Sequence, residues 1–161
     1  MKKIISIFFL ALAVLFNGCN KPECICNNTD TNDGGTVFEN EEESPDFVTF
    51  ADGKLPAGWK TYTWEIDNTL GYDDNYSLRA ANYPALVFAN KTMEVLGLVE
   101  FYSYGDVDFF IDDVMAQAIS SVADGNWKKR TYVLDKGHHK LMWKAEGVYK
   151  YIDNIKFCAF E

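Results

Sequence analysis

The sequence predicts an all-β protein folded as an antiparallel β-sandwich, and two observations carry this prediction. The first is the segment Tyr151–Phe157, which alternates with a period of two and places Tyr151, Asp153, Ile155 and Phe157 on one face. We expect this to be the closing strand, with that face buried. The second is the spacing of short strand-like segments with Gly and Asp turns between them, which is typical of a sandwich.

Further strands are predicted in chain order before the closing one. They are Phe47–Phe50, Trp59–Ile66, Ser77–Ala81, Leu86–Ala89, Val95–Tyr104, Val107–Ile111, Trp127–Leu134 and His139–Ala145. Within Trp59–Ile66, the alternation places Tyr62, Trp64 and Ile66 on one side. The segment 113–123 contains good helix formers, but we interpret it as strand because of the segments that precede and follow it. Trp127, His139, Trp143 and Ile155 are predicted to face the interior.

Residues 1–18 form the predicted signal peptide of a lipoprotein. Lys2 and Lys3 precede an apolar run, Ile4–Phe16, that is short for a membrane span. The sequence Phe-Asn-Gly-Cys that ends at Cys19 resembles a bacterial lipobox. We therefore expect Cys19 to be the lipidated N-terminus of the mature protein, anchored in the bacterial cell envelope at the outer membrane. The alternative is an ordinary secretory signal followed by a chance cysteine.

Residues 19–45 are predicted to form a disordered acidic tether, and residues 46–161 the folded domain. The tether is rich in Asn, Asp, Thr, Gly and Glu, and it contains almost no apolar residues. The formal net charge of the whole chain is -9, with no basic stripe. This charge argues against nucleic acid as a partner and leaves the lipid anchor as the predicted contact with the membrane.

Three cysteines remain besides Cys19, namely Cys24, Cys26 and Cys158. A Cys-X-Cys pair without a second pair is a weak metal signal. Outside the cytosol, either Cys24 or Cys26 can bridge Cys158 and attach the tether to the last strand. In the alternative interpretation, Cys158 is a small core residue.

Several short motifs, in order, resemble one family of extracellular domains. Leu55–Trp59 resembles its "LPxGW" opening, Ser77–Arg79 its "SLR" strand, and Tyr151–Ile155 its closing "YIDNI". Three more pieces match in the same order: Val99–Tyr102, Phe110–Val114, and the stretch from Trp127 to Trp143 with the pattern "W…Y-x-L…G-x-H-x-L-x-W". The domain is thus similar to jelly-roll domains of the cleaved-adhesin or choice-of-anchor type, common on surface proteins of Bacteroidota. The resemblance implies an antiparallel jelly-roll β-sandwich like those of concanavalin and carbohydrate-binding modules.

The resemblance also implies a structural calcium ion, the only cofactor that we expect. Its candidate ligands are Asp52, Asp73, Asn75 and Asp153, because calcium takes six to eight oxygen ligands and loops at one end of a sandwich supply them. The family often has a glutamate in its first strand where this chain has Ala51. In the alternative interpretation, Asp153 accepts hydrogen bonds from the backbone of a neighbouring loop.

The aromatic residues suggest a ligand-binding function. Exposed rings can stack on sugars, and the candidates are Tyr62, Tyr72, Tyr76, Tyr102 and Tyr104. The sequence contains no Gly-X-Ser-X-Gly motif, and acids such as Asp106 and Asp112 flank predicted turns, so we do not expect an enzyme. The leading expectation is a cell-surface module for adhesion or for binding glycans or glycoproteins. The alternative is an accessory lipoprotein that docks to other surface proteins, and a glycoside hydrolase comes last.

Overall fold

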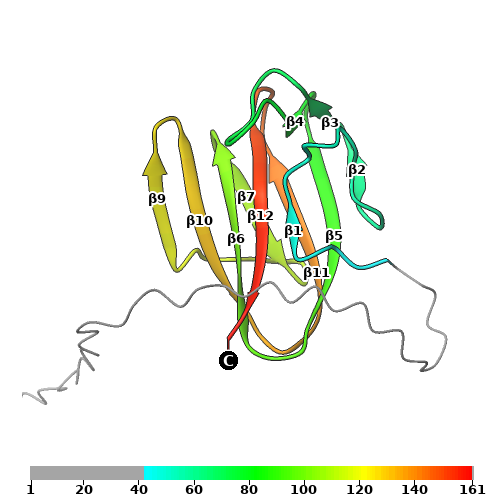
Figure 1. Ribbon diagram of the computed structural model, residues 1–161, viewed down its shortest axis with the longest axis vertical. Helices are drawn as coiled ribbons and strands as arrows, with labels where there is room; N and C mark the ends of the chain where they lie inside the picture. Colours follow the sequence, from blue (N-terminus) through cyan, green and yellow to red (C-terminus); the bar gives the residue numbers. More distant parts are fainter. Residues whose placement is uncertain (1–41, 161) are drawn as a thin grey trace, which may run out of the picture.

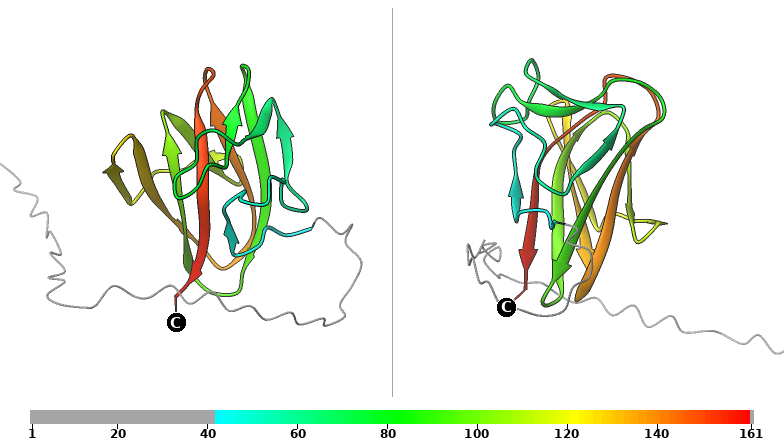
Figure 2. Two further views of the ribbon diagram at one scale, coloured as in Figure 1. Left: turned by 45° about the horizontal axis from the view of Figure 1, so that its top comes forward. Right: turned by 90° about the vertical axis from the view of Figure 1, so that its right-hand side faces the viewer.

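The computed structural model describes residues 42–160, which form two antiparallel sheets packed face to face (Figure 1, and edge-on in the right view of Figure 2). The large sheet has the strand order β3-β4-β12-β6-β10-β9, with β1 also paired to β12, and the small sheet has the order β2-β5-β11-β7-β8. The strands are β1 (Phe47–Val48), β2 (Lys60–Tyr62), β3 (Trp64–Asp67), β4 (Ser77–Ala80), β5 (Ala85–Met93), β6 (Gly97–Tyr104), β7 (Val107–Ile111), β8 (Val114–Met115), β9 (Ser120–Asp124), β10 (Trp127–Leu134), β11 (Gly137–Ala145) and β12 (Tyr151–Ala159).

The predicted β architecture is confirmed, including the ambiguous segment 113–123. That segment contains two strands, β8 at the edge of the small sheet and β9 at the edge of the large sheet, and so it passes from one layer to the other. Its side chains are almost all exposed, so no packed face could stabilise a helix there.

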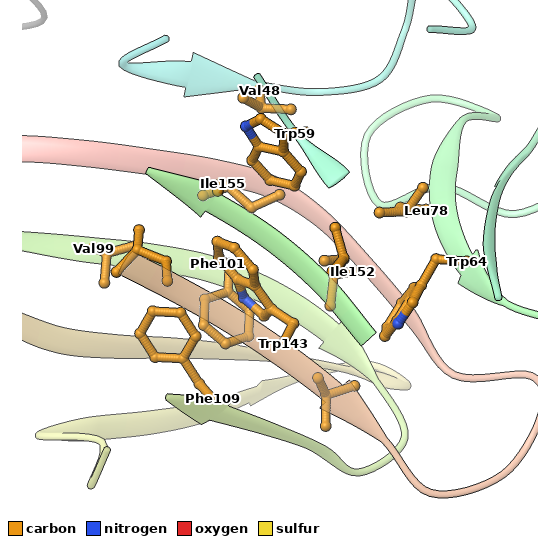
Figure 3. Packing of buried hydrophobic residues seen from close by; sticks show 14 of the residues in the cluster. Val48, Trp59, Trp64, Leu78, Val99, Phe101, Phe109, Trp143, Ile152 and Ile155 are labelled. Atoms are coloured by element: carbon orange, nitrogen blue, oxygen red, sulfur yellow. The ribbon is translucent and has the colours of Figure 1, made fainter. Parts of the chain in front are cut away.

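The core between the sheets is built from aromatic rings (Figure 3). Trp143 on β11 stacks on Trp59 with ring centroids 5.3 Å apart, and it also contacts Phe101 and Phe109. Alternate residues of β5, β6 and β11 are buried, as expected for strands that pack on one face. The predicted inward positions of Trp143 and Ile155 are confirmed, since both are fully buried in this cluster.

His139 also faces inward, as predicted, near the end of the sandwich where β10 turns into β11. Its Nδ1 lies 2.8 Å from a carboxylate oxygen of Asp112, and its Nε2 lies 2.9 Å from the carbonyl oxygen of Asp135. Both partners only accept hydrogen bonds, so the ring satisfies both when it is doubly protonated. Burial lowers the pKa of His139, but the contacts with Asp112 and Asp135 outweigh burial and raise it.

The face predicted for the first half of β12 is wrong. Tyr151 and Asp153 lie in register with Tyr104 and Tyr102, on the outer face of the large sheet, while Ile152 is buried in the core. A β-bulge between Asp153 and Lys156, with Asn154 at φ 48°, then shifts the alternation. Because a bulge adds one residue to one strand, both Ile152 and Ile155 reach the core, which a strict period of two forbids.

Two further orientation predictions are wrong. Trp127 is buried but lies outside the core cluster, because it pairs with Tyr104 on the outer face of the large sheet. The predicted strand Trp59–Ile66 is divided at Thr63, whose φ is 58°, so that Tyr62 belongs to the small sheet and Trp64 to the large one. Tyr62 is therefore exposed, whereas Trp64 is buried in the core.

Packing begins upstream of the predicted domain boundary at Asp46. Ser44 is buried, and its Oγ accepts a hydrogen bond from the indole nitrogen of Trp59 at 3.1 Å. Lys91 donates to the carbonyl oxygen of Ser44 at 3.0 Å and to Asp46 at 2.6 Å. The last residues of the predicted tether thus belong to the sandwich, while residues 1–41 lie outside the described part of the chain.

Cys158 is buried, at 2% exposed, but it is disulfide-bonded, so the alternative interpretation as an unbridged core residue is wrong. Its partner lies outside the described residues, as do Cys19, Cys24 and Cys26. The predicted lipidation of Cys19 and the signal peptide fall in the same region. None of residues 42–160 belongs to a helix with the length and hydropathy of a membrane span.

Candidate functional site

A cluster of aromatic side chains covers the outer face of the large sheet. Tyr104 on β6, Trp127 on β10 and Tyr151 on β12 meet edge to face, with ring centroids 5.7 to 6.4 Å apart. The cluster forms because these three positions lie side by side in the register of neighbouring strands. Edge-to-face contacts are a favourable geometry for aromatic rings. The sheet therefore carries apolar surface on both of its faces.

Tyr72 adds a ring to this cluster from the loop between β3 and β4. Its ring stacks on Tyr102 with centroids 3.5 Å apart and meets Trp127 edge to face at 6.0 Å. Its hydroxyl donates a hydrogen bond to the carboxylate of Asp124 on β9. The hydrogen bonds with Asp124 and Tyr102 raise the pKa of Tyr72 above its ordinary value, because both favour the protonated hydroxyl. Tyr72 thus covers Trp127, which accounts for the burial of a tryptophan on an outer face.

A shallow groove of ≈ 210 Å³ opens beside the stacked pair of Tyr72 and Tyr102. Polar side chains complete its lining, together with Phe47: Asp73, Glu100, Lys129, Asn154 and Lys156. Lys129 forms a 2.8 Å ion pair with Glu100. The groove, which we call the tyrosine groove, therefore offers aromatic faces next to hydrogen-bond donors and acceptors. This combination suits a ligand with apolar ring faces and hydroxyl edges.

Asp153 lies beneath the loop that carries Tyr72. It is 1% exposed, and its Oδ2 accepts a hydrogen bond from the backbone nitrogen of Tyr72 at 2.8 Å, while Oδ1 accepts one from Asn154 at 2.7 Å. Burial raises the pKa of Asp153 to about 7, although the two amide donors act in the opposite direction. The nearby Asp73 and Asp74 raise it further. These contacts match the alternative interpretation, in which Asp153 accepts hydrogen bonds from a neighbouring loop.

The predicted calcium ligands do not form a recognisable metal site. Within residues 42–160, no three His, Cys, Asp or Glu side chains form a group that could hold a metal ion. Asp52 is exposed and accepts a hydrogen bond from the backbone of Lys54 at 3.0 Å, whereas Asp73 accepts one from the Asn154 side chain. Asn75 is exposed in the loop that contains Asp73. Calcium binding at these residues stays a prediction, and backbone carbonyls would have to supply most of its ligands.

The structure brings together three of the five predicted ligand-binding tyrosines. Tyr72 and Tyr102 line the tyrosine groove, and Tyr104 belongs to the aromatic cluster beside it. Tyr76 instead packs against the hydrophobic core, and Tyr62 lies on the small sheet. The sequence could not separate these groups because the division at Thr63 and the packing of the loop depend on tertiary contacts.

Other residues of the site were not found from the sequence. Glu100 was already assigned to a strand, and the pattern Glu100-Phe101-Tyr102 indicates that a charged residue and a tyrosine share one face. Lys129 and Lys156 join them because β10 and β12 flank β6, in registers that the sequence alone does not give. The bulge in β12 is also required, since it turns Lys156 to the groove side.

A second hollow, of ≈ 380 Å³, lies on the small sheet and is lined by Gly58, Lys60, Phe88, Ala89, Asn90 and Lys140. Lys140 is 3.1 Å from Asp113 and lies over the ring of Phe88 at 5.6 Å, and Lys60 has an interaction partner as well. Phe88 is the one aromatic residue in its lining. The tyrosine groove is therefore the better candidate for a binding site.

No protein-family model and no curated protein matches the sequence. Solved structures do match the fold. The K3 cleaved adhesin domain of Lys-gingipain from Porphyromonas gingivalis has a TM-score of 0.51 at 13% identity, covering 71% of this chain and 98% of that one. TmCBM61 in complex with β-1,4-galactotriose has a TM-score of 0.52 at 13% identity, with 70% and 95% covered. At such low identity these similarities establish the fold alone, and the chain is an antiparallel jelly-roll β-sandwich as predicted.

Proposed function

We propose that this protein is a non-catalytic module of the cell surface that binds glycans or glycoproteins through the tyrosine groove. The observation that carries the proposal is the stacked pair of Tyr72 and Tyr102 at the edge of a groove with charged and amide side chains. A sugar ring has an apolar face that packs on an aromatic ring and hydroxyl groups that need donors and acceptors nearby. The groove supplies both on one face of the large sheet.

The polar residues of the groove support binding without catalysis. Glu100 is engaged by Lys129 and by the hydroxyl of Thr131, and Asp73 accepts a hydrogen bond from Asn154. A glycoside hydrolase uses two carboxyl groups on opposite sides of the scissile bond, one of them protonated. The carboxylates of the groove are instead held by neighbouring donors, which suits fixed hydrogen bonding to hydroxyl groups. The similarity to TmCBM61, which was solved with a bound galactotriose, also supports a glycan as the ligand.

Replacing Tyr102 with alanine should reduce glycan binding by about tenfold or more, because it removes one ring of the stacked pair and the surface it offers to a sugar. Binding is measured first on a glycan array that includes β-1,4-galacto-oligosaccharides, and then by titration calorimetry with the sugars that bind. Tyr62→Ala is the matched control, since it removes an exposed tyrosine from the other sheet. An equal loss in both variants, or a wild-type domain that binds no glycan, would contradict the proposal.

We propose in addition that the protein is anchored to the outer membrane through lipid on Cys19. The support is the basic start, the apolar run and the lipobox-like sequence of residues 1–19. The Cys19→Ala variant should lose labelling with an alkyne-tagged fatty acid and should move from the membrane fraction to the soluble fraction. Serine in place of Cys24 should leave both readouts unchanged. Membrane retention of Cys19→Ala would refute the anchor.

A second candidate function, docking to another envelope protein, is favoured by one observation. Val114, Met115, Ile119 and Val122 are each at least 58% exposed within a nine-residue stretch that includes β8 and part of β9. Such an exposed apolar patch is typical of a protein contact surface. An envelope partner that binds the wild type and Tyr102→Ala equally, but not Ile119→Ser, would favour docking over glycan binding.

A further inference from the structure

Tyr72 reaches across the outer face of the large sheet. One carboxylate binds its backbone nitrogen, and another binds the hydroxyl at the far end of its side chain. Its backbone nitrogen donates to Asp153 on β12, its ring lies on Tyr102 of β6 and against Trp127 of β10, and its hydroxyl donates to Asp124 on β9. One residue thereby joins four neighbouring strands of the sheet. We propose that Asp153 and Asp124 are positioning residues, which hold Tyr72 as the wall of the tyrosine groove.

The Asp153 end is fixed by a long-range contact. Residues 72 and 153 are 81 positions apart in the chain, and the carboxylate is almost completely buried when it accepts the amide. The loop is closely packed on itself just before Tyr72, because Gly71 approaches the carbonyl oxygen of Tyr76 so closely that a Cβ there would lie 2.3 Å from it. Without the carboxylate, the amide of Tyr72 would be left without its acceptor beneath the loop, which is unfavourable. The loop should then leave the sheet and take the ring with it.

The Asp124 end is fixed at the edge of the sheet. Asp124 is the last residue of β9, which pairs with β10 and with no other strand of the described chain. The exposed carboxylate fixes the direction of the Tyr72 ring by accepting from its hydroxyl, since this donor lies at the far end of the side chain. A hydrogen bond to a charged acceptor is stronger than a neutral one. Asp124 therefore acts on the ring and Asp153 on the backbone of the same residue.

Neither aspartate lines the groove, whereas Tyr72 does. If the groove binds a glycan, as proposed above, both aspartates should affect affinity through Tyr72 without touching the ligand. This part of the inference rests on the proposed function, whereas the placement of the Tyr72 ring does not. Glycan affinity and the placement of the Tyr72 ring can be measured separately.

The test compares Asp153→Ala, Asp124→Ala and Tyr72→Phe with the wild type. Without any sugar, NMR should show ring contacts between Tyr72 and Tyr102 in the wild type, their loss in Asp153→Ala, and weaker contacts in Asp124→Ala and Tyr72→Phe. Asp124→Ala should have no further effect in the Tyr72→Phe background, because both changes remove the same hydrogen bond. Asp52→Ala is the control, since Asp52 is exposed and accepts a hydrogen bond only within its own turn. Affinity for β-1,4-galactotriose should fall by about tenfold in Asp153→Ala.

An unchanged ring contact in Asp124→Ala overturns the inference, even if Asp153→Ala does not fold. The same conclusion follows if the effects of Asp124→Ala and Tyr72→Phe simply add. If the ring contacts change as expected but galactotriose does not bind the wild type, the placement of Tyr72 is upheld and the proposed function fails for this sugar. If galactotriose binds all variants equally while the ring moves, Tyr72 is not a wall of the binding site and the inference fails.

Discussion

Replacing Trp143 with alanine should lower the free energy of unfolding by about 3–5 kcal/mol, the range for truncating a large buried aromatic side chain. Trp143 is fully buried and lies between Trp59 from the segment before β2, Phe101 from the large sheet and Phe109 from the small one. Its removal leaves a cavity at the centre of the core that the two sheets cannot fill. Because small domains have total stabilities of about 5–15 kcal/mol, the loss should be visible as a large shift in urea denaturation followed by circular dichroism.

Trp143→Phe is the matched control for this prediction. The indole nitrogen of Trp143 has no hydrogen-bond partner among the described residues, so phenylalanine removes no hydrogen bond and retains part of the ring packing. We expect it to be clearly less destabilising than alanine. Equal losses in the two variants would show that ring packing at this position is not what stabilises the core.

The stability of the metal-free domain should fall as pH rises from about 4 to about 7, because of Asp153. Burial raises the pKa of this carboxyl from 3.8 to about 7, so the folded domain holds a proton in this range that the unfolded chain has lost. Folding is therefore favoured at the acidic end, and the stabilisation is lost as pH rises through the folded pKa. A difference of about three between the folded and unfolded pKa values corresponds to about 4 kcal/mol in the free energy of unfolding. Urea denaturation across this pH range measures the effect.

The variant Asp153→Asn isolates this contribution, since His139 acts in the same direction. The pKa of His139 is raised above 6.5, so its stabilisation is present below that value and is also lost at higher pH. In Asp153→Asn the slope between pH 4 and 7 should be smaller, even if the loss of one acceptor for two amides lowers stability at every pH. An identical slope in wild type and variant would contradict the assignment to Asp153.

The same experiment tests the predicted calcium ion. Calcium would favour the charged form of Asp153, so at pH 8 it should raise the melting temperature by a stabilisation of RT ln(1 + [L]/Kd), about 2.7 kcal/mol at a hundredfold excess over Kd. Magnesium should have little effect, because it requires a tighter octahedral site. A melting temperature that ignores calcium would leave Asp153 as an acceptor for the two amides alone.

The strands and most of the core could be predicted from the sequence, because alternation reports burial on one face. Trp127–Leu134 was predicted with the bounds that β10 has, and Trp143 and Ile155 were placed correctly. Alternation fails where both faces of a strand carry aromatic residues. Trp127 has the residue type of a core position, but the rings that cover it on the outer face include Tyr72, from a loop more than 50 residues earlier in the chain.

The candidate site was predicted only in part, for a related reason. Tyr72, Tyr102 and Tyr104 were identified by residue type, while Glu100, Lys129 and Lys156 depend on which strands are neighbours and in which register. Asp153 was correctly singled out as a carboxylate that needs a partner, but on the wrong face of its strand. No local signal for the bulge in β12 was recognised, since Asn154 also fits the regular alternation of the segment.

The bulge in β12 has a consequence for which sequence changes the closing strand can accept. If Asn154 stayed in the chain but took regular strand geometry, the bulge would be lost and every side chain after it would turn to the opposite face. Lys156 and the disulfide-bonded Cys158 would then point into the core, and Phe157 would point to the solvent. Substitutions at position 154 are limited mainly to residues that accept a positive φ, such as glycine or aspartate. A substitution at position 154 that favours regular strand geometry should therefore disturb the whole second half of β12, whereas loss of the residue itself would leave Ile155 and Phe157 facing the core.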